Sequence, residues 1–130
     1  MPKTRHISRW NAPTTAQETL AQDISEHLSG KWVFWILHVL EQAAQPLRFA
    51  RILEAVDGIS QKVLTRILRQ LEADGFVSRT IYAEVPPRVE YELTDLGRGL
   101  LAHIAPLRAW VLQNIDAFAA ARAKFGNRAE

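Results

Sequence analysis

Apolar residues recur at helical spacing over two stretches near the start of the chain. In residues 16–28 they form one narrow stripe at i, i+4 and i+8, made of Leu20, Ile24 and Leu28. Thr14 or Thr15 can cap this helix, and so narrow a stripe suits a partner helix better than a complete core. Residues 31–43 are apolar nearly all round, so we expect a second helix that is buried on most sides and forms the centre of the fold.

Two shorter helices joined by a tight turn are predicted over residues 46–74. Pro46 fits the first turn of the third helix, because its missing N–H costs nothing there. Asp57-Gly58 ends this helix with glycine at the left-handed cap position, and its apolar stripe is Phe49, Ile52, Leu53 and Val56. Ser60 then caps a fourth helix that reaches about Ala73. So short a turn between two helices is typical of a helix-turn-helix.

The pattern then changes from helical to alternating. Residues 76–82 and 88–93 predict the two strands of a hairpin, since apolar and charged positions alternate through the second of them. Pro86 and Pro87 cannot donate to a β-ladder, so we expect them at the exposed tip.

A long last helix is predicted over residues 95–116, opened by Thr94 with Asp95. Its apolar positions are Leu96, Leu100, Ile104, Leu107 and Val111. Pro106 removes one helical hydrogen bond and clashes with the preceding turn, so the helix should kink or split there. Residues 117–130 are rich in Ala, Arg and Lys and are expected to fray.

These elements predict a mainly α fold of the α+β kind, a winged helix-turn-helix in one domain of residues 14–116. The helix-turn-helix occupies 46–74 and a two-stranded β wing occupies 76–93. The flanking N- and C-terminal helices are expected to be dimerisation helices, through Leu20, Ile24, Leu28, Leu107 and Val111. Residues 1–13 are expected to be a flexible basic arm; the alternative is an arm that contacts DNA phosphates or a partner subunit through Trp10.

The fourth helix has two chemically different faces. On a helical wheel Thr65, Arg66 and Arg69 lie within about 60° of Lys62. The opposite side carries Val63, Leu64, Ile67, Leu68 and Leu71. Arg, Lys, Thr and Gln side chains bind base edges, and the helix's N-terminal end adds Ser60 and Gln61. The sequence therefore predicts a recognition helix over residues 60–73 that enters a DNA major groove; the alternative is the charged face of any surface helix.

Four further arginines are candidate DNA contacts. Arg48 and Arg51 on the third helix are candidates for the backbone, and Arg88 at the wing tip for a flanking phosphate or minor groove. Arg79 on the first strand is a further candidate DNA-binding residue. For each, the alternative is a plain surface arginine. Sixteen Lys and Arg against fourteen Asp and Glu leave a net charge of only +2, so the prediction rests on where the charges lie.

The composition excludes several kinds of chemistry. The chain has no cysteine, which excludes disulfides, thiolate metal ligands and thiol redox sensing. We expect no metal, because His27, His38 and His103 lack ligand spacing, and no cofactor or enzymatic activity, because no catalytic constellation appears. No apolar run reaches the roughly 20 residues that span a bilayer, and no secretory signal is recognised, so a cytoplasmic location is expected.

The chain closely resembles the HxlR-type winged helix-turn-helix regulators of bacteria. The matching residues are Gly30-Lys31-Trp32, Leu47-Arg48-Phe49, and residues 58–65, 68–77 and 82–97, with the specific run Val85-Pro86-Pro87-Arg88-Val89-Glu90-Tyr91. The resemblance covers about residues 20–112. It implies a homodimeric transcription regulator that dimerises through its first and last helices, with the fourth helix in the major groove. Many relatives carry a sensing cysteine near the start of the first helix; this chain has none around Thr19.

The sequence thus predicts a homodimeric, sequence-specific regulator on a near-palindromic double-stranded DNA operator. One alternative is a non-specific architectural protein, which a stronger basic excess would favour. Another is a winged-helix protein-interaction module without sequence-specific DNA binding, which exposed apolar residues on the fourth helix would favour. Any regulation is expected to come from a non-covalent ligand, from protein abundance or from a partner protein. A small-molecule effector would enter between the first, second and last helices, where Trp32, Trp35 and Trp110 are candidate walls, although core packing also explains these residues.

Overall fold

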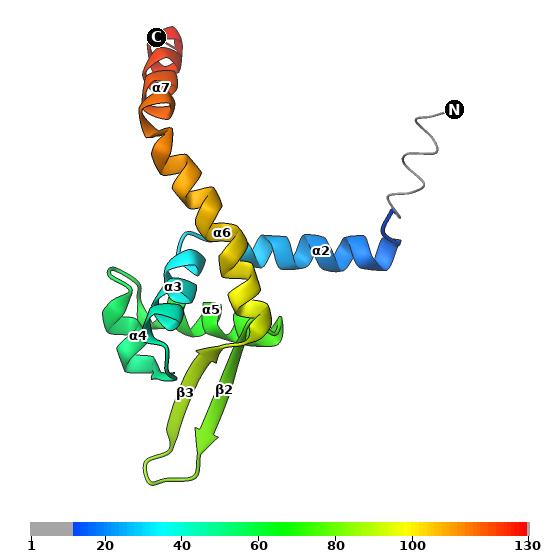
Figure 1. Ribbon diagram of the computed structural model, residues 1–130, viewed down its shortest axis with the longest axis vertical. Coiled ribbons are helices and arrows are strands. Elements are labelled where there is room, and N and C mark those ends of the chain that lie inside the picture. Colours follow the sequence, from blue (N-terminus) through cyan, green and yellow to red (C-terminus); the bar gives the residue numbers. More distant parts are fainter. Residues whose placement is uncertain (1–11, 130) are drawn as a thin grey trace.

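The computed structural model describes residues 12–129 (Figure 1). In chain order its elements are α2 (Thr15–Leu28), α3 (Val33–Ala43), β1 (Leu47–Arg48), α4 (Phe49–Ala55), α5 (Gln61–Ala73), β2 (Val77–Tyr82), β3 (Arg88–Leu93), α6 (Asp95–Gln113) and α7 (Ile115–Ala129). Helices dominate, and the strands form one antiparallel sheet of order β1-β3-β2. The predicted mainly α winged helix-turn-helix is confirmed.

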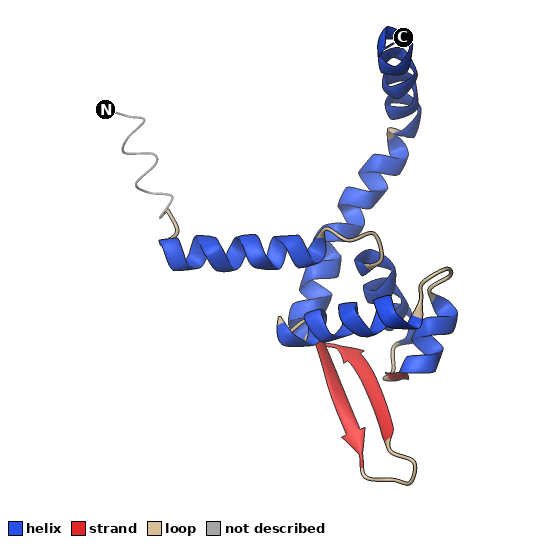
Figure 2. Cartoon of the chain, turned by 180° about the vertical axis from the view of Figure 1, so that it is seen from behind, coloured by secondary structure: helices blue, strands red, loops and turns tan. Residues whose placement is uncertain are grey.

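The wing is a regular hairpin that projects from the body of the molecule (Figure 2). β2 pairs with β3 from Val77↔Leu93 to Tyr82↔Arg88, and the two prolines lie in the exposed loop between them. The short strand β1 adds to the other edge of β3, through Leu47↔Tyr91 and Arg48↔Glu90. The sheet therefore joins the start of the helix-turn-helix to the wing.

Strand β1 corrects the prediction for Pro46. Pro46 does not lie in the first turn of a helix; it precedes β1, and α4 begins only at Phe49. Residues 47 and 48 pair with β3, and this tertiary contact decides their conformation over the local helix-start signal. Gly58 does take the predicted positive φ, 87°, but in the turn after α4 rather than directly at its C-cap, Val56.

The N-caps follow the sequence prediction. Thr14 Oγ1 accepts a hydrogen bond from Gln17 N at 3.1 Å, and Gln17 Oε1 accepts one from Thr14 N at 2.9 Å, which is a capping box. Ser60 Oγ accepts from Val63 N at 3.1 Å and so fixes where α5 begins.

The core is built around α3, as predicted. Its buried residues Val33, Ile36, Leu37 and Leu40 pack with buried residues of α4, α5 and the sheet: Ile52, Leu64, Ile67, Leu68, Leu71, Val77 and Leu93. Burial is not complete around α3, since Trp35 is 40% exposed.

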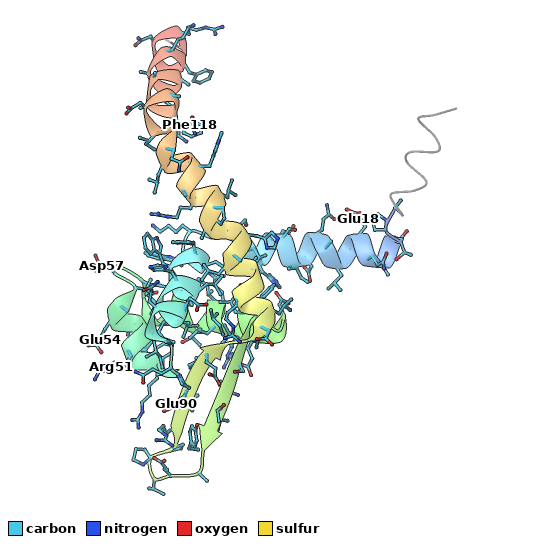
Figure 3. The ribbon with its side chains drawn as sticks, viewed as in Figure 1. Glu18, Arg51, Glu54, Asp57, Glu90 and Phe118 are labelled. Atoms are coloured by element: carbon cyan, nitrogen blue, oxygen red, sulfur yellow. The ribbon has the colours of Figure 1, made fainter. Side chains whose placement is uncertain are left out.

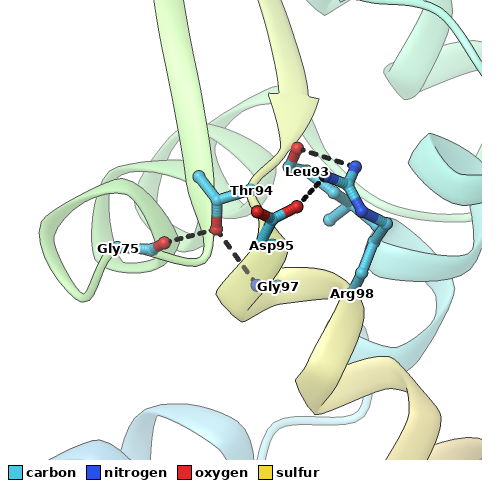
Figure 4. Close-up of polar contacts among 6 residues, drawn as sticks. All are labelled: Gly75, Leu93, Thr94, Asp95, Gly97 and Arg98. Atoms are coloured by element: carbon cyan, nitrogen blue, oxygen red, sulfur yellow. Dashed lines mark hydrogen bonds and ion pairs between the residues drawn. The ribbon is translucent and has the colours of Figure 1, made fainter.

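The start of α6 is bonded to the turn that follows α5 (Figure 4). Thr94 Oγ1 donates to the Gly75 carbonyl at 2.6 Å and accepts from Gly97 N at 3.0 Å, while Thr94 N donates to the Phe76 carbonyl at 3.1 Å. A Cβ atom on Gly97 would lie only 2.1 Å from the Phe76 oxygen. The absence of a side chain at position 97 thus lets α6 pack directly on the backbone of Phe76, in the turn that follows α5.

Two helical arms extend from this body in different directions (Figure 1). α2 has no buried residue, although Ile24 and Leu28 are partly buried against the core. α6 continues past Pro106 to Gln113, so of the two expected outcomes, a kink or a split, the split is absent, because one missing hydrogen bond does not end a helix. The chain turns instead at Asn114, and residues 115–129 form α7 where fraying is expected from the sequence; this segment is rich in alanine, the strongest helix former.

Candidate nucleic-acid interface

Helix α5 has the predicted division into two faces. Its buried residues are Leu64, Ile67, Leu68 and Leu71, while Lys62, Arg66 and Arg69 are exposed. Within residues 12–129 none of these three cations forms an ion pair. They are therefore free to bind an external anion or acceptor.

The polar side chains of Ser60 and Thr65 form hydrogen bonds to the backbone of α5 itself. Ser60 is the N-cap, and Thr65 Oγ1 donates to the Gln61 carbonyl at 2.8 Å. Their oxygens remain able to accept, but their geometry is set by the helix. Gln61 is exposed at the N-terminal end of α5, as expected from the sequence.

A cleft of about 420 Å³ lies between α5 and the sheet. It is lined by Phe49, Thr65, Arg69, Glu72, Arg79 and Tyr91. Arg79 Nε lies 3.3 Å from Glu72 Oε1, which joins the first strand of the wing to α5. Burial raises the pKa of Tyr91 above its usual value of 10.0, with Arg79 acting in the opposite direction, so this phenol stays protonated at neutral pH.

Sequence reasoning missed Glu72 and Tyr91. The alternation of β3 shows that Tyr91 lies on the inner side, but no local pattern shows which helix faces it. The neighbours across the cleft are set by the packing of α5 on the sheet, which only the structure reveals.

The wing arginine Arg88 is held inside its own hairpin. Its guanidinium carbon lies 3.9 Å from the Tyr82 ring centroid, and its nitrogens lie 3.2 Å from Glu84 Oε2 and 3.7 Å from Glu90 Oε2. The side chain is 30% exposed. Arg88 is thus not the freely reaching tip residue expected from the sequence; Val85, next to the prolines, is fully exposed instead.

The arginines before and within α4 differ in setting. Arg48 is exposed but lies on β1, not on the third helix as expected. Arg51 is on α4 and lies 4.0 Å from Glu54, with both side chains mostly exposed (Figure 3). So weak a surface pair leaves Arg51 available to another anion.

The predicted tryptophan pocket is only partly assembled. Trp32 and Trp35 line a cavity of about 210 Å³ with Ala55, Val56 and Asp57. Trp110 is not among its walls; its ring packs 5.8 Å from that of Phe118 on α7. The structure thus brings Trp32 and Trp35 together at one cavity, while Trp110 packs on α7 instead.

The three histidines within the described residues have separate partners. His27 Nδ1 is 2.7 Å from Asp74 Oδ2, His38 stacks on the Phe34 ring, and His103 Nδ1 is 2.8 Å from the Gly99 carbonyl. No group of three or more metal-ligating side chains comes together within residues 12–129. None of the helices described is long and apolar enough to cross a membrane.

Comparison with known proteins identifies this arrangement. Residues 27–118 match the HxlR-like helix-turn-helix family. The chain belongs to that family. The HTH-type transcriptional regulator YtfH of Escherichia coli K12 is 34% identical over 107 residues, which cover 82% of this chain and 83% of YtfH. YtcD of Bacillus subtilis is 41% identical over 91 residues, 70% of this chain and 71% of YtcD.

Solved structures agree with the sequence relatives. The reduced form of the transcriptional regulator YodB from B. subtilis superposes with a TM-score of 0.61 at 33% identity, covering 78% of this chain and 94% of YodB. The redox regulator HypR in its reduced form gives a TM-score of 0.66 at 33% identity, covering 77% of this chain and 97% of HypR. The predicted HxlR-type regulator is confirmed, and a family of transcriptional regulators implies DNA binding and not an enzyme.

Proposed function

We propose that this HxlR-family regulator is a homodimer that binds a near-palindromic operator through α5. The observation that carries the proposal is the exposed face of α5 beside a projecting wing (Figure 2), with three cations that form no ion pair with any residue the structure describes. Such a helix fits the major groove, and the wing then lies along the neighbouring backbone. Arg66 and Lys62 are suited to guanine, and Gln61 to adenine.

Exposed apolar residues on the two arms support the homodimer. Leu20 on α2 is 59% exposed, and Leu107 and Trp110 on α6 are 62% and 54% exposed. Further exposed residues continue along the C-terminal arm: Val111, Leu112, Ile115, Phe118 and Phe125. A second copy of the chain would remove this surface from water. Because Ile24 and Leu28 already pack on their own core, Leu20, Leu107 and Val111 are the proposed contacts of greater weight.

The protein-interaction alternative lacks support in α5. That alternative needs exposed apolar residues on the helix, whereas the exposed residues of α5 that the structure describes are polar or charged, except Ala73 at its end. The observed face favours DNA.

Regulation is proposed to come from a non-covalent ligand. The chain has no cysteine, so thiol oxidation cannot signal. The cavity beside Trp32 and Trp35 adjoins Val56 and Asp57, which begin the turn between α4 and α5. A small aromatic ligand that fits better in one state of that turn would change DNA affinity.

A mobility-shift assay on DNA adjoining the gene tests the proposal, with Arg66→Ala as the variant. Loss of a bidentate base contact should weaken operator binding by about 1–3 kcal/mol and relax preference at one base position. Arg122→Ala on α7 removes an equal charge away from α5 and serves as the control. If Arg66→Ala keeps both affinity and site preference, α5 does not read the operator.

A further inference from the structure

The cleft between α5 and the wing brings together groups that are far apart in the sequence. Thr65, Arg69 and Glu72 follow one another at i, i+4 and i+7, so they lie along one side of α5. Arg79 and Tyr91 face them from the sheet, where they are direct partners across the β2–β3 ladder. One wall of the cleft thus belongs to the proposed recognition helix and the other to the base of the wing.

The hydrogen-bonding capacity of this cleft is largely unused. Within residues 12–129, Arg69 has no ion pair and the Tyr91 hydroxyl has no hydrogen-bond partner. Arg79 meets Glu72 through Nε, and both side chains of this pair are 39% exposed, so an anion from solvent can reach them. Tyr91 lines the cleft together with Arg69, Glu72 and Arg79, and all three charges act on the pKa of its hydroxyl.

We propose that this cleft binds one backbone phosphate of DNA, held by Arg69, Arg79 and the Tyr91 hydroxyl, and that Glu72 competes with it. This inference rests on the proposed DNA-binding function. A strand that passes from the groove occupied by α5 to the wing crosses the space between them, and phosphate is the group that the DNA backbone presents there. Two guanidinium groups and a phenol are donors that suit phosphate oxygens.

Glu72 gives the cleft a property that a plain basic patch lacks. Without DNA its carboxylate neutralises Arg79 at 3.3 Å. With DNA the carboxylate and the phosphate are like charges within a few ångströms, and both seek the same guanidinium. Glu72 therefore weakens binding to every DNA sequence equally, and sequence preference stays with the bases that α5 contacts.

Three variants test the cleft on the operator and on a random-sequence duplex, each titrated over a range of salt. Tyr91→Phe should weaken both complexes equally, by about tenfold, with an unchanged salt slope, because a neutral donor releases no counterion. Arg79→Gln should weaken both and flatten the slope by about 0.9 per subunit. Glu72→Gln should strengthen both by about fivefold, a gain that misfolding does not produce.

Matched controls isolate the cleft. Glu18→Gln removes the same charge at the far end of α2 (Figure 3) and should leave affinity unchanged. Tyr82→Phe removes the chain's other phenol hydroxyl, outside the cleft, and keeps the ring under Arg88. Thermal unfolding of each variant establishes that it is folded.

Two results would overturn the inference alone: wild-type affinity in Tyr91→Phe, or weaker binding in Glu72→Gln, while Arg66→Ala still loses site preference. Failure of the wild-type protein to bind either duplex would instead overturn the proposed function, and the cleft with it.

Discussion

Gly97 offers a sharp test of how α6 is held against the rest of the fold. A Cβ atom at this position would meet the Phe76 carbonyl oxygen at 2.1 Å, its carbon at 3.1 Å and Leu93 Cδ2 at 3.2 Å. The first contact is with backbone, which cannot turn aside as a flexible side chain can. Gly97→Ala must therefore move the start of α6 by about 1 Å away from the turn after α5.

The size of the effect follows from what that movement breaks. It breaks the 3.1 Å bond that Thr94 N donates to the Phe76 carbonyl and the 2.6 Å bond that Thr94 Oγ1 donates to the Gly75 carbonyl. Loss of two hydrogen bonds costs about 2 kcal/mol, and overpacking adds about 1–3 kcal/mol. The better helix propensity of alanine offsets about 1 kcal/mol of this loss. The net loss of about 2–4 kcal/mol should lower the unfolding midpoint by about 10 °C.

Gly99→Ala is the matched control on the same helix. No heavy atom of another group lies within 4 Å of a Cβ built there, so only the propensity gain of about 1 kcal/mol remains and the midpoint should rise. Thermal unfolding followed by circular dichroism at equal protein concentrations compares both variants with wild type. If the unfolding midpoint of Gly97→Ala equals that of wild type or of Gly99→Ala, α6 does not pack on the Phe76 backbone.

Three further predictions concern the pair His27–Asp74, the wing and the helical arms. The hydrogen bond to Asp74 raises the pKa of His27 above 6.5, so this contact stabilises the fold below pH 6.5 and stabilises it less as the pH rises through the folded-state pKa. The difference in unfolding free energy between wild type and His27→Gln should therefore be greatest in acid, and a difference that does not change with pH would contradict this. Arg88→Ala should speed amide exchange at the ends of β2 and β3 and flatten the salt slope of DNA binding by less than about 0.9 per subunit; a full unit would mean that Arg88 meets phosphate directly. Leu107→Glu should sediment as a 14.7 kDa monomer while Leu96→Glu, exposed at the other end of α6, stays dimeric; identical behaviour of the two would argue against an α6 interface.

The sequence predicts the parts of this fold whose signals are local. Thr14, Ser60 and Thr94 each cap a helix where an oxygen-bearing side chain precedes an amphipathic run, and the structure has all three caps. The alternation of apolar and charged residues in β3 and the two prolines likewise predict the hairpin and its loop. The amphipathic face of α5 follows from helical period alone, so the sequence predicts each of its exposed cations individually.

The parts that could not be predicted depend on contacts between distant segments. Strand β1 exists because residues 47 and 48 pair with β3, and nothing in their own sequence competes with the helix signal of Pro46. The same holds for the cleft, where Glu72 gains its role only by facing Arg79. Position along the hairpin predicts Arg88 as a DNA contact, whereas the structure shows it paired with Glu84 and Glu90, both within four residues of it.

Helix α5, the proposed recognition helix, is held at its C-terminal end by both proposed dimerisation helices. Asp74, directly after α5, pairs with His27 at the end of α2, and Gly75 accepts the hydrogen bond from Thr94 at the start of α6. The N-terminal end of α5 is joined instead to the turn at Gly58, where a Cβ atom would lie 3.5 Å from the Trp32 ring. A dimer formed through α2 and α6 would therefore set the spacing of the two α5 helices through one end. A ligand beside Trp32 would act at the other end, and could tilt α5 in its groove without separating the subunits.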